Sequence, residues 1–150
     1  MAAKADSVGR LLSELVNRVS HASGETLSIM AEAQVTLQQV LLLTRLREAG
    51  SSSASGLAAT LRLSLPAVSQ AVDRLVRMEL LTRMEDGVDR RRKAIATTAK
   101  ANALLDRLSR ARANDYSVGL SGLPQETQER FREFLREALS QLKRIQDRGK

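Results

Sequence analysis

The stretch LAATLRLSLPAVSQAVDRLVR, residues 57–77, constrains the fold most, because it encodes two short helices separated by a tight turn. Apolar residues recur at helical spacing on both sides of the turn, and Ser64 can cap the second helix. Leu57 on the first helix can meet Val68 and Val72 on the second, which would hold the two helices at a steep angle. We therefore expect a helix-turn-helix.

The residues that follow predict a β-hairpin with a strongly basic tip. Residues 81–85 and 92–97 resemble two short strands, joined by a turn that uses Asp86 and Gly87. A helix-turn-helix followed directly by two such strands is a winged helix. The expected fold class is therefore mainly α with a small β-hairpin wing.

The outward face of the second helix and the hairpin tip carry side chains suited to double-stranded DNA. Ala67 lets the backbone approach a groove, Gln70 can offer a bidentate amide to adenine, and arginines can reach phosphates. The arginines of the tip would lie along the DNA backbone or in the minor groove, and Asp89 can orient Arg91. The predicted DNA-contacting residues are Ser64, Ala67, Ser69, Gln70, Arg74, Arg77, Asp89, Arg90, Arg91, Arg92 and Lys93.

Other interpretations of the same residues remain open. The second helix could be an ordinary amphipathic helix with a solvated polar face, and the basic hairpin could serve only to discourage edge-to-edge aggregation. The wing could instead dock onto an acidic protein partner. Binding to RNA or to single-stranded DNA is disfavoured, because such binding relies on aromatic side chains that stack on bases, and the chain has two Phe, one Tyr and no Trp.

Helices are predicted on both sides of this core. Residues 7–22 form an amphipathic pattern, and Thr36 with Gln39 forms a capping box that opens a helix ending at Gly50. A further helix begins after the serine-rich GSSSASG, and a long one runs from Thr98 to about residue 118. The last helix has a seam of apolar residues at alternating spacings of four and three, which is typical of packing along another helix: Phe131, Leu135, Ala138, Leu142 and Ile145.

Charge and composition narrow the class of protein. The net charge is +7, and the excess begins at Arg62, since residues 1–61 hold five basic and five acidic groups. Such a charge predicts attraction to polyanions. The chain has no cysteine, one histidine and no catalytic motif, so we expect neither an enzyme nor a cofactor. No long apolar segment is present, and a cytoplasmic protein is expected.

The sequence of residues 57–105 resembles the winged-helix core of the MarR (multiple antibiotic resistance regulator) family. The shared pattern is a short helix, an "LS" turn, "VSQAVDRL", an apolar "LL", a wing with Asp-x-Arg, and a Thr that opens a long helix. The resemblance implies one domain over residues 1–150, with a winged helix-turn-helix core at about 36–98 and dimerisation helices at about 7–22 and 98–146. It also implies a homodimer that acts as a repressor on pseudo-palindromic DNA, with contacts at Ser64, Ala67, Ser69, Gln70, Arg74, Asp89 and Arg91.

The resemblance also implies regulation of DNA binding by a small molecule. Family members often release DNA when a small aromatic or other apolar effector binds, and Leu11, Leu15, Leu42 and Leu46 could line a crevice for one, although plain core is the simpler interpretation. His21 beside Glu25 is better explained as a polar residue at a helix end than as a metal or pH site.

The turn departs from the family pattern at one residue. Arg62 stands where the turn often has Gly, and a left-handed conformation there would cost on the order of 1 kcal/mol.

Overall fold

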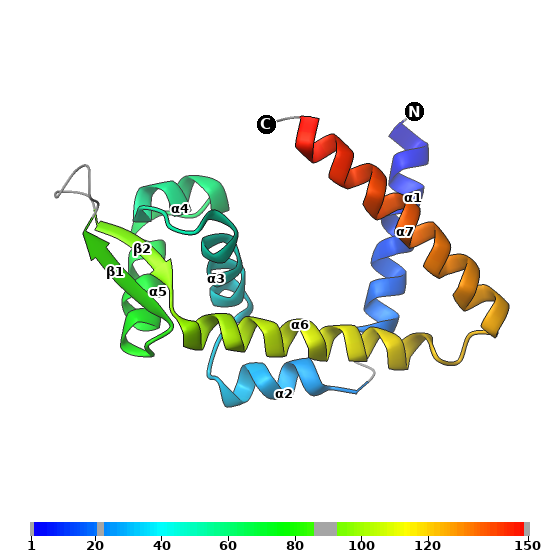
Figure 1. The fold of residues 1–150 in the computed structure, drawn as a ribbon, viewed down its shortest axis with the longest axis horizontal. Helices are drawn as coiled ribbons and strands as arrows, with labels where there is room; N and C mark the ends of the chain where they lie inside the picture. The colour runs from blue at the N-terminus through cyan, green and yellow to red at the C-terminus, as the bar shows by residue number, and fades with distance from the viewer. Residues whose placement is uncertain (1, 21–22, 86–92, 149–150) are drawn as a thin grey trace. The chain divides into compact units, whose positions relative to one another are not determined.

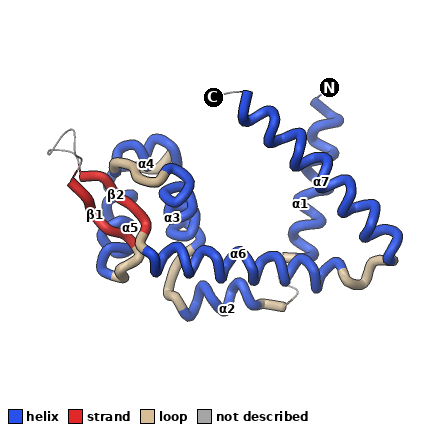
Figure 2. Tube along the Cα trace, in the orientation of Figure 1, coloured by secondary structure: helices blue, strands red, loops and turns tan. Residues whose placement is uncertain are grey.

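A computed structural model describes residues 2–20, 23–85 and 93–148 of the protein (Figure 1). Its elements are α1 (Ala2–Val19), α2 (Glu25–Glu32), α3 (Leu37–Ala49), α4 (Ala54–Leu61), α5 (Leu65–Arg77), β1 (Leu81–Glu85), β2 (Lys93–Thr97), α6 (Ala99–Leu120) and α7 (Gln125–Arg148). Helices dominate and the two strands form one hairpin (Figure 2). The predicted fold class, mainly α with a β-hairpin wing, is confirmed.

The chain divides into two compact units. One unit comprises Gly24–Ala113, and the other comprises Met1–Ser23 together with Asn114–Lys150. The long helix α6 contributes residues to both. The helix-turn-helix and the hairpin belong to the first unit, which is called the winged-helix unit below; the second is called the terminal-helix unit.

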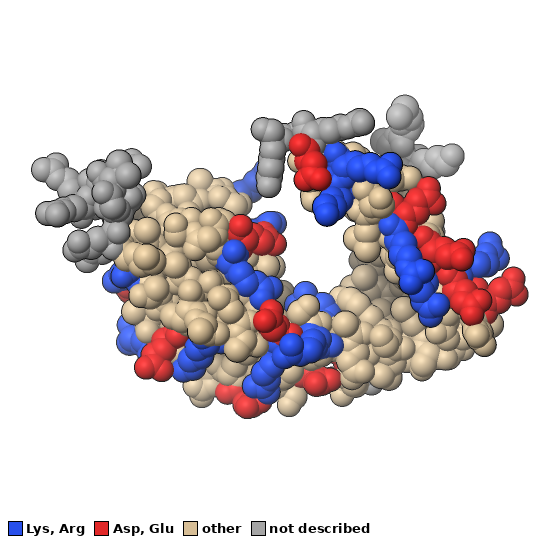
Figure 3. Space-filling model, in the orientation of Figure 1, with Lys and Arg blue, Asp and Glu red and all other residues tan. Residues whose placement is uncertain are grey.

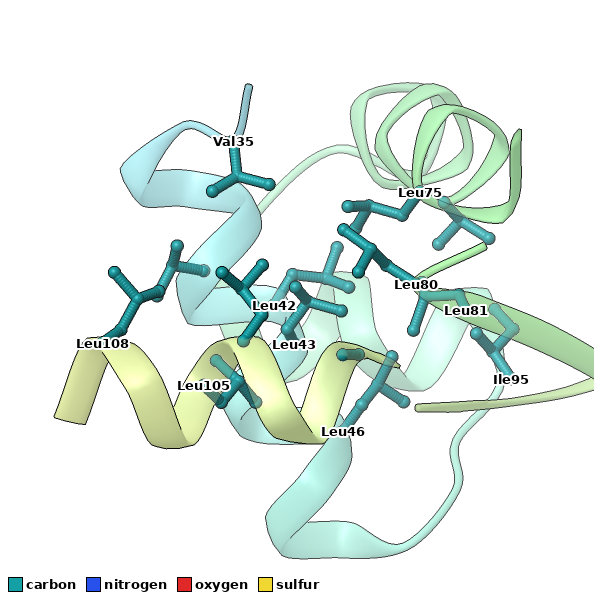
Figure 4. Packing of buried hydrophobic residues seen from close by; sticks show 14 of the residues in the cluster. Val35, Leu42, Leu43, Leu46, Leu75, Leu80, Leu81, Ile95, Leu105 and Leu108 are labelled. Atoms are coloured by element: carbon teal, nitrogen blue, oxygen red, sulfur yellow. The ribbon is translucent and has the colours of Figure 1, made fainter. Parts of the chain in front are cut away.

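Helix α3 provides the centre of the winged-helix unit. Its Leu42, Leu43 and Leu46 are completely buried. Figure 4 shows them between Leu105 of α6 on one side and the side chains of α5 and the hairpin on the other. Full burial of a leucine stabilises a fold by about 1.5–3 kcal/mol, so this cluster fixes the positions of α5 and the hairpin relative to α3. Leu42 and Leu46, which could have lined an effector crevice, are therefore plain core residues.

The helix ends of this unit follow the local signals in the sequence. The Thr36 hydroxyl accepts a hydrogen bond from the Gln39 amide at 3.3 Å, and the Gln39 side chain accepts one from the Thr36 amide at 3.0 Å, so the predicted capping box is present. Gly50 ends α3 at a φ of 77°, a conformation that disfavours a side chain. These caps satisfy amides and carbonyls that the helix itself leaves without partners.

The hairpin is held near its middle by a segment from outside it. β1 and β2 pair antiparallel, with Leu81 opposite Thr97 and Arg83 opposite Ile95. Ser52, in the connection between α3 and α4, exchanges backbone hydrogen bonds with Ile95 at 3.0 and 2.8 Å. The side chain of Ile95 is buried in the core. The strand β2 is thus bonded on both edges near its middle.

The terminal-helix unit contains a close helix contact and a buried carboxylate. A Cβ atom placed on Gly119 of α6 would lie 2.7 Å from the Cα of Val19 in α1, so only glycine fits this approach. Asp115, one turn earlier on α6, is completely buried, and its carboxylate accepts hydrogen bonds from the amide of Ser23 at 3.0 Å and from the Ser23 hydroxyl. These contacts join α6 to the end of α1 and the segment that follows it.

The same unit exposes an unusual number of large apolar side chains. They lie on all three of its helices and on the connection before α7, and Phe134, Leu139 and Ile145 are each about two-thirds exposed, at 65%, 65% and 66%. The others are Val8, Leu11, Leu12, Val118, Leu123, Leu135 and Leu142. Phe131 and Ala138 of the predicted seam are half-buried. Large apolar side chains exposed in such numbers mark an interaction site in proteins that fold in water.

Two helical segments differ from the sequence prediction. α2 occupies residues that were expected only to interrupt the first helix, and α1 begins at Ala2 rather than at residue 7 and ends at Val19 rather than at residue 22. α2 has Gly24 at its N-cap with no side-chain hydrogen bond, and Ile29 is its one buried residue. A short helix with so little local signal is specified by packing rather than by propensity. His21 lies outside the described residues.

Within the described residues, no helix is both long and apolar enough to cross a lipid bilayer.

Candidate nucleic-acid interface

The turn between α4 and α5 is tightened by an arginine in the left-handed conformation. Ser53 caps α4 by accepting a hydrogen bond from the Gly56 amide at 3.1 Å. At the other end Arg62 has φ 54° and ψ 42°, and the Leu63 amide donates to the Ala58 carbonyl at 3.0 Å. Helices often end in this way, although usually with glycine. The left-handed turn is therefore present, with arginine in place of the usual glycine.

Helix α5 begins as the sequence predicts. The Ser64 hydroxyl accepts from the Ala67 amide at 3.3 Å, and Pro66 stands in the first turn where its missing amide is not needed. Val68, Val72 and Leu75 face the core and are completely or almost completely buried. The opposite side of α5 is consequently turned outward.

The outward side of α5 carries most of the predicted contact residues. Gln70, Arg74 and Arg77 are all exposed and follow one another at intervals of four and three residues, which places them on one face of the helix. Ala67 and Ser69 are half-buried and flank that face. Ser64 is exposed as well, but its hydroxyl oxygen is already used in the cap.

Two polar contacts of α5 were not anticipated. Asp73 forms an ion pair with Arg83 of β1, which ties the outward side of α5 to the first strand of the hairpin. The Arg74 Nη2 donates to the backbone carbonyl of Gln34 at 3.3 Å, so this guanidinium also fastens α5 to the connection between α2 and α3. Both contacts join residues from different elements, and no local pattern reveals them.

The hairpin tip lies largely outside the described residues. Asp89, Arg90, Arg91 and Arg92 fall in the gap between residues 85 and 93, and Lys93 is described only as the first residue of β2, opposite Glu85. What the structure places is the base of the hairpin, which packs against α5. The predicted roles of the tip residues remain predictions.

The connection from the hairpin to α6 is fixed by one side chain. The Thr98 hydroxyl donates to the Glu79 carbonyl at 2.7 Å and accepts from the Ala101 amide at 3.2 Å, while the Thr98 amide donates to the Leu80 carbonyl at 3.2 Å. The predicted cap of α6 therefore also holds the segment before β1. This threonine couples the wing to the long helix.

Basic and acidic side chains are interspersed on the face drawn in Figure 3, so the described surface seen there carries no broad area of a single charge. Among the described residues, no group of three or more histidine, aspartate or glutamate side chains is placed to hold a metal ion. The candidate interface is thus a local arrangement: the outward face of α5 beside the base of a hairpin whose tip sequence is basic.

Fold and site together define a winged-helix protein. The MarR family model matches residues 35–93, from just before α3 to the start of β2. This match confirms the resemblance to the MarR winged-helix core that was found in the sequence.

Solved structures with this fold cover nearly the whole chain. The transcriptional regulator Tm0710 from Thermotoga maritima matches with a TM-score of 0.79 and 23% identity, over 93% of this chain and 96% of that one. The S. aureus MepR–DNA complex matches with a TM-score of 0.67 and 25% identity, over 87% and 98%. Wild-type MarR from E. coli matches with a TM-score of 0.66 and 18% identity, over 87% and 95%. A comparison with curated proteins finds no match.

Proposed function

We propose that this protein is a sequence-specific regulator of transcription that binds double-stranded DNA through α5 and the wing. The observation that carries the proposal is the outward row of Gln70, Arg74 and Arg77 on α5, beside a hairpin that the Asp73–Arg83 ion pair ties to the same helix. An α-helix of this kind fits the major groove, where amide and guanidinium groups read base edges and phosphates. MepR, whose complex with DNA has this fold, supports the proposal.

The proposal assigns different roles in DNA binding to α5 and to the wing. Gln70 reads bases, with Ser64, Ala67 and Ser69 allowing a close approach, while Arg74 and Arg77 contact phosphates. In the wing, Arg90, Arg91, Arg92 and Lys93 follow the DNA backbone or enter the minor groove, and Asp89 orients Arg91. Phosphate contacts supply affinity and base contacts supply specificity, so the two sets are separable by experiment.

The protein acts as a homodimer in this proposal. The apolar side chains exposed on α1 and α7 would be covered by a second copy of the same helices. In a two-fold dimer the two recognition helices read half-sites about 10 bp apart, centre to centre, and the operator is pseudo-palindromic. A dimer on such an operator can repress by occupying a promoter, and a small apolar effector would regulate its release.

Binding can be tested on genomic fragments selected with the purified protein. We expect Arg91→Ala to weaken binding to many sequences and to lower the slope of log affinity against log salt by up to about 0.9 for each phosphate that the variant no longer neutralises. Arg45→Ala, which removes an exposed arginine of α3 paired with Glu48, is the matched control and should leave the slope unchanged. Equal slopes for the wild type and both variants would exclude the wing from the interface.

The competing function is a winged helix that docks onto an acidic protein partner. Gln70→Ala separates the two, because removal of the amide that reads a base should reduce discrimination between the selected site and a scrambled one by about 1–3 kcal/mol. A fall in DNA affinity that is equal for the selected site and the scrambled site would favour the function in which the wing docks onto a protein partner.

A further inference from the structure

Among the described residues, three that are not glycine hold a left-handed backbone conformation: Gln34 at φ 54°, Arg62 at φ 54° and Glu79 at φ 59°. They follow the ends of α2, α4 and α5, and in each case the amide of the next residue donates to a carbonyl five residues earlier, at 2.9 to 3.1 Å. Glycine is the usual residue at such a helix end, because a Cβ atom is disfavoured there. Backbone strain that persists in a folded protein is concentrated at functional sites.

Contacts within the chain engage two of these three residues. The Glu79 carboxylate pairs with Lys100 at 3.3 Å, and the Gln34 carbonyl accepts a hydrogen bond from Arg74 at 3.3 Å. Arg62 is different, because its side chain is exposed and its guanidinium has no hydrogen-bond or ion-pair partner among the described residues. No side-chain contact within the described part of the chain therefore offsets the strain at Arg62, and its cation is available to a partner outside the chain.

Arg62 lies at the junction of the two helices of the helix-turn-helix. It is the C-cap of α4 and precedes Ser64, the N-cap of α5, by two residues. When a helix-turn-helix binds DNA, the first helix crosses the DNA backbone and the second enters the major groove. In the proposed complex the junction therefore lies where the backbone borders the groove, at the end of α5 opposite to Arg74 and Arg77.

We propose that Arg62 is a further DNA-contacting residue, whose guanidinium binds a backbone phosphate at the α4 end of α5. A guanidinium suits this role, because its planar set of donors can form two parallel hydrogen bonds to phosphate oxygens. Phosphate contacts carry no sequence information directly, so Arg62 adds affinity and fixes the register of α5 without selecting bases. The inference rests on the proposed DNA-binding function and adds to it a cation before α5.

Binding is measured by fluorescence anisotropy over a range of salt concentrations, with the genomic fragment selected by the wild-type protein and with a scrambled duplex of the same length. We expect Arg62→Gly to bind both about tenfold more weakly, the loss typical of one charged hydrogen-bonded contact. The slope of log affinity against log salt should fall by about 0.9 for each bound copy of the chain. Arg45→Ala removes an equal charge from α3, outside the proposed interface, and should keep both the affinity and the slope.

Two further variants separate the effect of the charge from that of the backbone. Arg62→Gln keeps the Cβ atom and the left-handed strain but removes the charge, so it should lose as much affinity as Arg62→Gly. Arg62→Lys keeps the charge and should retain the salt slope of the wild type. In urea denaturation Arg62→Gly should be at least as stable as the wild type, whereas loss of a purely structural residue would lower stability and DNA affinity together.

Chemical substitution in the DNA identifies the phosphate itself. Neutral methylphosphonate groups are placed one at a time along both strands of the selected duplex. At one or more positions the substitution should weaken binding of the wild-type protein but not that of Arg62→Gly, because the variant has already lost the same contact. Substitutions that affect both proteins equally at every position would overturn the proposal.

The outcomes also distinguish the role of Arg62 from the function on which it rests. Wild-type protein that binds no duplex DNA would overturn both. Wild-type binding together with unchanged affinity and salt slope in Arg62→Gly and Arg62→Gln would overturn the role of Arg62 alone. The contacts proposed for Gln70 and the wing would then still stand.

Discussion

At the scale of single residues, Arg62 occupies a left-handed backbone position at which glycine is usual. Its left-handed φ of 54° disfavours any residue with a Cβ atom. We expect Arg62→Gly to raise the free energy of unfolding by up to about 1 kcal/mol in urea denaturation, because the strain is removed. Arg62→Ala keeps the strain and should give no gain; a gain as large as that of glycine would mean that the charge, not the backbone, is responsible.

Two helical glycines of the terminal-helix unit offer a matched comparison. A Cβ on Gly9 of α1 meets nothing within 4 Å, whereas one on Gly119 of α6 would clash with the backbone of Val19. Gly9→Ala should therefore stabilise the protein by about 0.5–1 kcal/mol, the usual gain within a helix. Gly119→Ala should lower the midpoint of thermal unfolding instead. Equal effects at the two positions would show that α1 and α6 do not approach closely in solution.

At the scale of the secondary-structure elements, Thr98 joins the wing to α6. Thr98→Val keeps the shape of the side chain but removes both hydroxyl hydrogen bonds, and should cost about 1–2 kcal/mol of unfolding free energy. In Thr60 the hydroxyl only donates to the carbonyl of Gly56 one turn earlier, so Thr60→Val should change stability by less than about 0.5 kcal/mol. A Thr98→Val protein as stable as the wild type would contradict this role.

Local signals explain which elements could be predicted from the sequence. The capping box at Thr36 and the caps at Ser64 and Thr98 depend on residues within four positions, and all three form as expected. α2 could not be found in this way, because Gly24 supplies no side-chain cap and Ile29 alone is buried.

The same distinction between local signals and contacts of distant segments applies to the candidate site. The outward face of α5 follows from helical spacing, so Gln70, Arg74 and Arg77 could be placed from the sequence. The bonds from Arg74 to Gln34 and from Ser52 to Ile95 could not, because they join segments that only the folded core brings together.

At the scale of the whole molecule, the proposed dimer would depend on surface that one chain leaves uncovered. Leu142 of α7 is 54% exposed, so a charge there would be harmless in a monomer. In the proposed dimer it is buried, and Leu142→Glu should shift the protein toward monomers in sedimentation at micromolar concentration. Ser140→Glu adds the same charge on the opposite side of α7 and should remain dimeric. A wild-type protein that sediments as a monomer would defeat the dimer outright.

The bond that Ser52 makes with Ile95 has a consequence for how such a protein can diversify. Because the hairpin is clamped from outside at Ile95, we expect the base of the hairpin to form with little dependence on the sequence at its far end. We therefore expect the described residues on either side to tolerate insertions, deletions or exchanges between positions 86 and 92. In the proposed DNA-binding role, the far end is therefore an exchangeable module, so that the strength of DNA binding can change during evolution while the rest of the molecule stays unchanged.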